Sequence, residues 1–198
     1  MGTANKGLIL SPGKHSFECW ADADYAGNWN QTFAMEDITM ARSCSRYMIT
    51  YVGCLLIWAS CLQTEIALST MEAENISLST ALCKVIALMA LCKELQDKIS
   101  PDIHPTPTIY CKAFEDNSGA NLLLHPRCAL TQNTSMQNTI IFRSHIDRKL
   151  IQISQVITDK QLADFYTKQC SLELFESFCE VILGWNTLTD SQPLDEGV

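Results

Sequence analysis

The sequence predicts an α/β fold in which helices cover a mixed sheet. Residues 16–23 have the pattern of a strand that ends at an acid, and residues 46–53 and 55–61 are rich in β-branched and aromatic side chains. Residues 70–98 then carry apolar side chains at helical spacing. A further strand pattern and more helical patterns follow, in the order typical of a sheet with helices packed on it.

Length and composition predict one folded domain with a buried core. The 198 residues are 47% hydrophobic and 18% charged, which argues against disorder. The formal net charge of −8 is opposite in sign to the basic face of typical nucleic-acid-binding proteins. Ten cysteines occur without a CxxC pair or a secretory signal. We therefore expect reduced thiols, no structural zinc and an intracellular protein, cytoplasmic or nuclear and not secreted.

The first half of the chain predicts a strand, a loop and a hairpin. Residues 24–42, after the first strand, are rich in turn-forming side chains. Two strands follow at 46–53 and 55–61 and turn at Gly53. Residues 47–64 contain no charged side chain, so a membrane helix is an alternative by length. Gly53 and the β-branched residues favour the hairpin.

The second half predicts a long helix followed by shorter elements. One face of the helix over residues 70–98 carries Leu78, Leu82, Val85, Met89 and Cys92. Later strands are expected at 108–114 and 151–157. Later helices are expected at 117–124, 140–150, 159–168 with Asp159 as its cap, and 172–183.

Four acidic residues stand in four separate motifs. They are Asp22 in ADADYAG, Glu72 in LSTMEAEN, Asp116 in CKAFEDNSGA and Asp164 in KQLADFYTK. Carboxylates gathered from distant parts of a chain suit Mg²⁺ and Mn²⁺, which prefer oxygen ligands. Two such ions about 3.5–4 Å apart can clamp the attacking and leaving oxygens of a phosphodiester. The four acids therefore indicate metal-dependent cleavage of a nucleic-acid strand.

Each acid, taken alone, also has a purely structural explanation. Ser69 and Glu72 match a capping box at the start of the long helix, and Asp116 matches an N-cap. Lysines four residues to either side of Asp164 are typical of a solvated ion-pair face. Asp22 fits an ordinary turn at a strand end.

Taken together, the motifs resemble one protein family. The chain contains ADADYAG, IWASCLQTEIALSTMEAE, IYCKAFEDNSGA and QLADFYTK in that order. This series resembles the ribonuclease H domain of copia-type LTR retrotransposon polyproteins, over roughly residues 2–185. We expect an isolated, divergent fragment of such a polyprotein. Residues 1–15 would be a remnant of the linker from the reverse transcriptase, 16–185 the ribonuclease H-like domain and 186–198 a mobile tail.

The resemblance implies a ribonuclease H-like fold, a five-stranded mixed sheet flanked by helices on both faces. It also implies hydrolysis of the RNA strand of RNA–DNA hybrids with two Mg²⁺ or Mn²⁺ ions. The implied catalytic and metal-binding residues are Asp22, Glu72, Asp116 and Asp164. Asp24 and Glu74 are close rivals, but in the family pattern the first acid of each pair is catalytic. We expect a monomer with no small-molecule cofactor and no membrane contact.

Several positions depart from the family pattern. Arg46 replaces a glycine, Cys61 replaces a basic residue that would contact a phosphate, and Asn75 replaces a tyrosine. The family's R-T-K-H-I segment is missing after Arg127, and His145 is not assigned the role of its histidine. These losses and the acidic charge favour an alternative function. It is a catalytically inactive retroelement remnant that keeps the fold and serves only as a binding or structural module.

Overall fold

The structure, a computed structural model, describes residues 7, 9, 16–33, 35–99, 108–116, 136–166 and 171–184. Within them, five strands form one sheet in the order β3-β2-β1-β4-β5. The strands are β1 (Ser16–Asp24), β2 (Cys44–Tyr51), β3 (Cys54–Leu62), β4 (Tyr110–Glu115) and β5 (Ile151–Gln155). The β1, β2 and β3 pairings are antiparallel, whereas β1–β4 and β4–β5 are parallel. The predicted five-stranded mixed sheet is confirmed.

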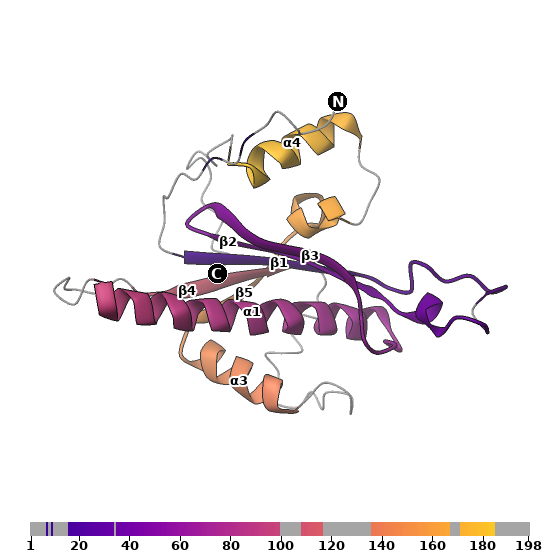
Figure 1. Cartoon of the computed structure of the whole chain (residues 1–198), viewed down its shortest axis with the longest axis horizontal. Helices are drawn as coiled ribbons and strands as arrows, with labels where there is room; N and C mark the ends of the chain where they lie inside the picture. Colours follow the sequence, from indigo (N-terminus) through magenta and orange to yellow (C-terminus); the bar gives the residue numbers. More distant parts are fainter. Residues whose placement is uncertain are drawn as a thin grey trace.

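Helices cover both faces of this sheet (Figure 1). α1 (Thr70–Ile99) and α3 (Met136–Asp147) lie on one face, and α4 (Leu172–Ile182) lies on the other. Three short 3-10 helices are η1 (Ile38–Ala41), η2 (Thr158–Lys160) and η3 (Leu162–Tyr166). The face with α4 also carries η3, which contacts β1, β2 and α4. The prediction of helices on both faces is confirmed.

The uncharged stretch 47–64 forms most of the β2–β3 hairpin and not a membrane helix. Val52 and Gly53 both adopt positive φ, at 57° and 77°, which matches the tight turns that suit twisted hairpins. The predicted turn at Gly53 is confirmed. By length and composition alone, α1 is apolar enough to cross a membrane, yet its buried side chains pack on the sheet.

The main core lies between the sheet and α1. Phe17, Cys19 and Ala21 alternate along β1 and are fully buried on this face. The predicted stripe of α1 packs against them: Leu78, Leu82, Val85 and Met89 are buried, and Cys92 is partly buried against the cluster. A smaller cluster on the opposite face joins Met48 of β2 to Phe178 and Ile182 of α4. This second cluster fixes the layer that carries η3.

The segment before α4 differs from the sequence prediction. One helix over 159–168 is expected, but the described part of this stretch forms the separate turns η2 and η3. The residue that caps η2 is Ile157, so the assignment of Asp159 as a cap is wrong. The physical reason lies at Gln161, between the two turns, because its side chain is buried and bonded to β1.

One predicted helix has different bounds in the structure, and several predicted segments lie outside the described residues. α3 begins at Met136 rather than at residue 140 and ends at Asp147. The helix predicted at 117–124 and the tail 186–198 lie outside the described residues, as does most of 1–15. The proposed domain bounds therefore stay predictions.

An arm, residues 25–41, projects from the sheet at the end of β1 (Figure 1). It contains η1 and has several exposed apolar side chains, of which Met35 is 96% exposed. The hydroxyl of Ser43 anchors its base by accepting the Ala26 N–H at 3.2 Å. The arm marks the edge of the sheet where the acidic residues meet.

Candidate metal centre

Strand topology brings three parts of the chain to one edge of the sheet. β1 and β4 are parallel neighbours, so Asp22 near the end of β1 and Asp116 just after β4 share that edge. β3 runs in the same direction as β1, because two antiparallel pairings separate them. Its continuation therefore starts α1 at the same edge. The positive end of the helix dipole lies there as well.

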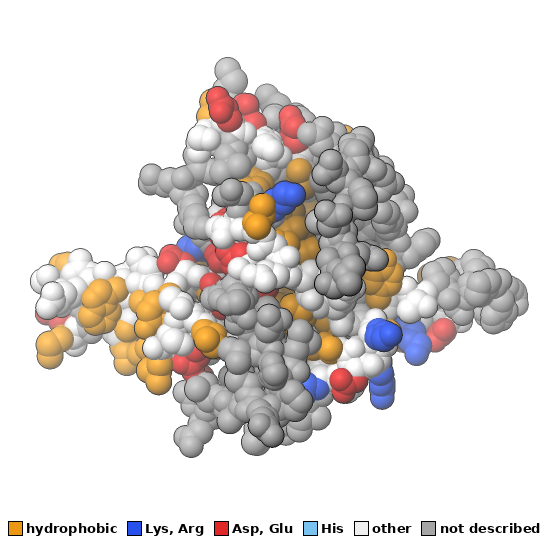
Figure 2. Space-filling view, turned by 180° about the vertical axis from the view of Figure 1, so that it is seen from behind, with side chains coloured by type: hydrophobic (Ala, Val, Ile, Leu, Met, Phe, Trp, Pro, Cys, Tyr) orange, Lys and Arg blue, Asp and Glu red, His pale blue; other side chains and the backbone are white. Residues whose placement is uncertain are grey.

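Three carboxylates form a cluster at this edge. One side-chain oxygen each from Asp22, Glu74 and Asp116 lies within 4.8 Å of the other two. Asp22 is only 7% exposed, and the other two are half-buried. Figure 2 shows acidic side chains gathered where the arm meets the body of the molecule. The predicted meeting of Asp22 with Asp116 is therefore observed in the fold.

Glu72, in contrast, caps α1 and lies outside this three-carboxylate cluster. Its backbone N–H donates to Ser69 Oγ at 3.1 Å, and its Oε2 accepts the Leu68 N–H at 2.7 Å. Two residues along a helix turn the side chain by about 200°, so Glu72 and Glu74 cannot share a face. In this geometry the acid that α1 brings to the cluster is Glu74, whereas the sequence predicts Glu72.

The pKa of Glu74 is raised by its buried place in the cluster. Burial, followed by the charges of Asp22 and Asp116, raises the pKa of Glu74 to about 8. A hydrogen bond from the Ala23 N–H opposes this shift, and the charge of Asp164 adds to it. Glu74 Oε2 is also buried with no hydrogen-bond partner among the described residues. Crowded carboxylates with an unused buried oxygen fit the ligand set of a hard divalent cation.

Asp164 approaches the cluster from η3 and is 8% exposed. Gln161 holds it there. The Gln161 side chain is fully buried and donates from Nε2 to the Ala21 carbonyl at 2.9 Å, while Asp164 N–H donates to the Gln161 carbonyl at 3.1 Å. The glutamine of the QLAD motif thus ties the fourth acid to the strand that carries the first.

Two further residues hold α1 against the sheet beside the cluster. Gln63 is buried and donates from Nε2 to Ser45 Oγ and to the Ala73 carbonyl, both at 2.9 Å. Ser77 Oγ lies 2.7 Å from the Asp22 carbonyl and 3.2 Å from that of Arg46.

Sequence reasoning missed the positioning roles of Gln63, Ser77 and Gln161. Both glutamines stand inside the recognised motifs next to apolar runs. Such a buried amide usually needs hydrogen-bond partners, and this was the available signal.

His145, the one histidine among the described residues, is not a member of the three-carboxylate cluster. His145 lies in the last turn of α3, on the α1 side of the sheet. His104, His125 and the departure after Arg127 lie outside the described residues.

Comparison with known proteins gives relatives among transposon polyproteins. The chain is 30% identical over 188 residues to the retrovirus-related Pol polyprotein from transposon RE2 of Arabidopsis thaliana, covering 91% of this chain and 11% of that protein. The corresponding polyprotein from transposon TNT 1-94 of Nicotiana tabacum is 26% identical over 188 residues, covering 94% of this chain and 13% of that protein. The chain thus spans about a ninth of its curated relatives. No family model matches the chain.

Two solved structures are similar at low identity. The N-terminal RNase H domain of rv2228c from Mycobacterium tuberculosis has a TM-score of 0.47 at 10% identity, covering 84% of this chain and 98% of that one. LC11-RNase H1 from compost has a TM-score of 0.44 at 13% identity, covering 76% of this chain and 91% of that one. The chain is therefore similar to a segment of retrovirus-related Pol polyproteins from plant transposons, and its five-stranded mixed sheet with helices agrees with the ribonuclease H-like fold that its motifs predict.

Proposed function

We propose that this domain hydrolyses the RNA strand of RNA–DNA hybrids with two Mg²⁺ or Mn²⁺ ions. The observation that carries the proposal is the cluster of Asp22, Glu74 and Asp116, whose ligand atoms lie within 4.8 Å of one another. The charges of Asp22 and Asp116 disfavour ionisation of Glu74, and a divalent cation between the three carboxylates would remove that repulsion and allow all three to be ionised. The buried, unpartnered Glu74 Oε2 supports this role.

Each residue has a defined part in the proposed site. Asp22, Glu74 and Asp116 bind cations, and Asp164 completes the set from η3. Ser77 fixes the backbone of Asp22, and Gln161 keeps Asp164 against β1. When bound, the cations would activate water and stabilise charge on the phosphodiester. The chain itself supplies position and negative charge and forms no covalent bond to the substrate.

The net charge favours the alternative, a catalytically inactive remnant that keeps the fold and serves only as a binding or structural module. A chain with net charge −8 repels the phosphates of a hybrid, whereas binding normally relies on lysine and arginine contacts. Because salt screens repulsion between like charges, activity should be sought at moderate ionic strength with added Mg²⁺ or Mn²⁺.

The test is cleavage of an end-labelled RNA–DNA hybrid by the purified chain, with and without Mg²⁺. We expect Asp22→Asn and Glu74→Gln each to lower the rate by more than about 100-fold, or about 2.7 kcal/mol of barrier. Asp97→Asn, at an exposed position of α1 far from the cluster, is the matched control and should keep full activity.

Glu72→Gln separates the two glutamates, because it makes the same chemical change two residues away. It should keep most of the activity if Glu74 is the ligand. Equal activity in the parent and in Asp22→Asn would reveal a contaminating nuclease. No cleavage by the parent with either ion would establish the inactive remnant instead.

A further inference from the structure

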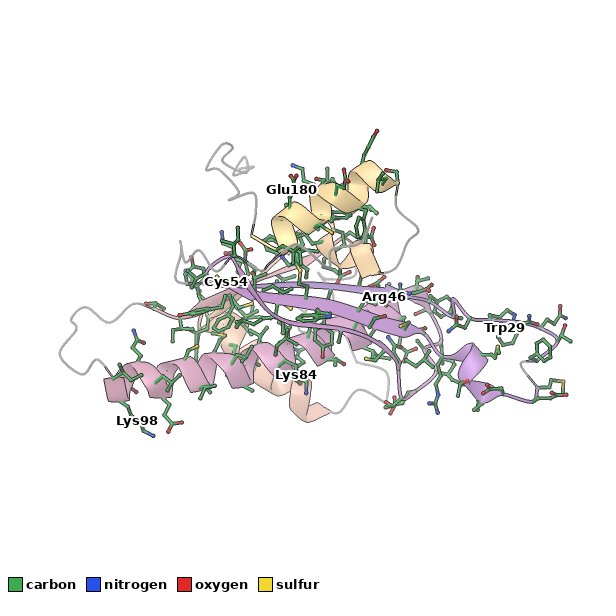
Figure 3. All side chains as sticks on the ribbon, turned by 45° about the horizontal axis from the view of Figure 1, so that its top comes forward. Trp29, Arg46, Cys54, Lys84, Lys98 and Glu180 are labelled. Atoms are coloured by element: carbon green, nitrogen blue, oxygen red, sulfur yellow. The ribbon has the colours of Figure 1, made fainter. Side chains whose placement is uncertain are left out.

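Arg46 places a buried positive charge beside the acidic cluster. In the β1–β2 ladder it lies directly opposite Asp22, so both side chains project from the same face of the sheet. Arg46 is 9% exposed, and its Nη2 donates to Asp24 Oδ2 at 3.2 Å. Figure 3 shows Arg46 at the end of the sheet near the arm, whereas Lys84 and Lys98 lie on α1 away from that end.

The surroundings of Arg46 do not suit a purely stabilising residue. Its Nε and Nη1 are buried and have no hydrogen-bond partner among the described residues. Leaving buried donors unpaired is unfavourable, and a guanidinium stays charged at all relevant pH values. The backbone here is regular strand and not positive φ, so the family's glycine is not required for conformation. What Arg46 adds to this position is therefore charge.

The same arginine also occupies a neighbouring carboxylate. Asp24 lies two residues after Asp22 on the same face of β1, and its side chain is 41% exposed. The ion pair with Arg46 holds it, and Gly27 packs so closely on the Asp24 carboxylate that a Cβ there would clash with it. Asp24 is therefore held in an ion pair with Arg46 and is not one of the three carboxylates of the cluster.

We propose that Arg46 is a built-in countercharge that weakens divalent-cation binding by Asp22, Glu74 and Asp116. This inference rests on the proposed metal site and concerns how strongly that site is occupied. A fixed positive charge on the same sheet face lowers the attraction for a doubly charged ion, and Asp24 offsets that charge only in part. In a relative with glycine at this position, the site would lack this opposing charge.

Binding of Mn²⁺ to the purified chain, followed by isothermal titration calorimetry, tests the inference without any measurement of activity. We expect Arg46→Met to tighten the Mn²⁺ dissociation constant by about tenfold, and Arg46→Lys to leave it within about twofold. Asp24→Asn should act in the opposite direction and weaken binding by about threefold, because it leaves the Arg46 charge uncompensated. Arg42→Met, which removes a positive charge from the base of the arm, is the control and should change the constant by less than about twofold.

The outcomes separate this inference from the metal site itself. Equal affinity in the parent and in Arg46→Met, with binding lost in Asp22→Asn, would overturn the countercharge and leave the site standing. Absence of binding in the parent and in every variant would overturn both. Binding by Arg46→Met alone would support both. Thermal unfolding checks that each variant is folded, and Arg46→Gln is a second neutral variant should Arg46→Met unfold.

Discussion

β1 contributes both to the hydrophobic core under α1 and to the acidic cluster at its end, and burial has opposite energetic effects in these two regions. Phe17, Cys19 and Ala21 are fully buried apolar residues, and the next position is the buried carboxylate Asp22. In the core, burial removes apolar surface from water and stabilises the fold. In the cluster, burial brings like charges together and destabilises the cation-free protein. Removing a buried side chain should therefore lower the free energy of unfolding in the core, whereas removing a charge should raise it in the acidic cluster of the cation-free protein.

The largest effect is expected in the core. Leu82→Ala removes a fully buried side chain of α1 and should lower the free energy of unfolding by about 2–5 kcal/mol. Leu95→Ala, on the same helix but 45% exposed, should cost less than about 1 kcal/mol. Urea unfolding measures both, and similar losses at the two positions would show that the core is not where the structure places it.

The second-largest effect is a gain in the free energy of unfolding when Glu74 is neutralised, and this gain depends on pH. Because the pKa of Glu74 is raised to about 8, the folded protein keeps a proton that the unfolded chain releases at lower pH. The stabilising contribution of Glu74 is therefore full at acidic pH and is lost as pH rises through about 8. Glu74→Gln should stabilise the cation-free protein by about 1–3 kcal/mol at pH 9, and by much less at pH 5.

Unfolding of the parent and of Glu74→Gln at both pH values, with a chelator present, measures this difference. Taking the difference cancels the titration of other groups. A Glu74→Gln variant less stable than the parent at pH 9 would contradict the repulsive cluster.

A smaller effect is expected where the two regions are joined. Ser77→Ala removes the hydroxyl that bonds the Asp22 and Arg46 carbonyls and should cost about 1–2 kcal/mol of unfolding free energy. It should also weaken Mn²⁺ binding, since the Asp22 backbone loses its support. Ser79→Ala makes the same change two residues along α1, and its effect on Mn²⁺ binding should be negligible. Equal effects of Ser77→Ala and Ser79→Ala on Mn²⁺ binding would show that Ser77 does not position the cluster.

The smallest effect is expected at the helix cap. Glu72→Ala removes the acceptor of the Leu68 N–H and should cost about 0.5–1 kcal/mol. Mn²⁺ affinity should stay within about twofold of the parent value. A large loss of Mn²⁺ affinity in Glu72→Ala would indicate that Glu72, and not Glu74, is the metal ligand from α1.

Local sequence patterns were enough to predict most of the fold. The hairpin at Gly53 and the buried stripe of α1 follow from alternation and helical spacing, which depend on near neighbours. The two turns at η2 and η3 could not be predicted in this way. Their shape depends on the Gln161 side chain reaching Ala21 in a distant strand.

For the site, the order of the motifs predicted that Asp22 and Asp116 would meet, but it named Glu72 where the structure brings Glu74 to the cluster. Glu72 matches a capping box that is visible in the sequence, whereas Glu74 is defined only by the face that α1 turns to the sheet. That face is fixed by tertiary packing.

The hydrogen bond from Gln161 to Ala21 spans 140 positions of the chain. On a ribosome that adds about 5–20 residues per second, Gln161 leaves the exit tunnel roughly 7–28 s after Ala21. Until then the nascent sheet lacks the side chain that holds its fourth carboxylate in place. The proposed site therefore stays incomplete until the chain has been synthesised past Asp164, which Gln161 holds beside β1.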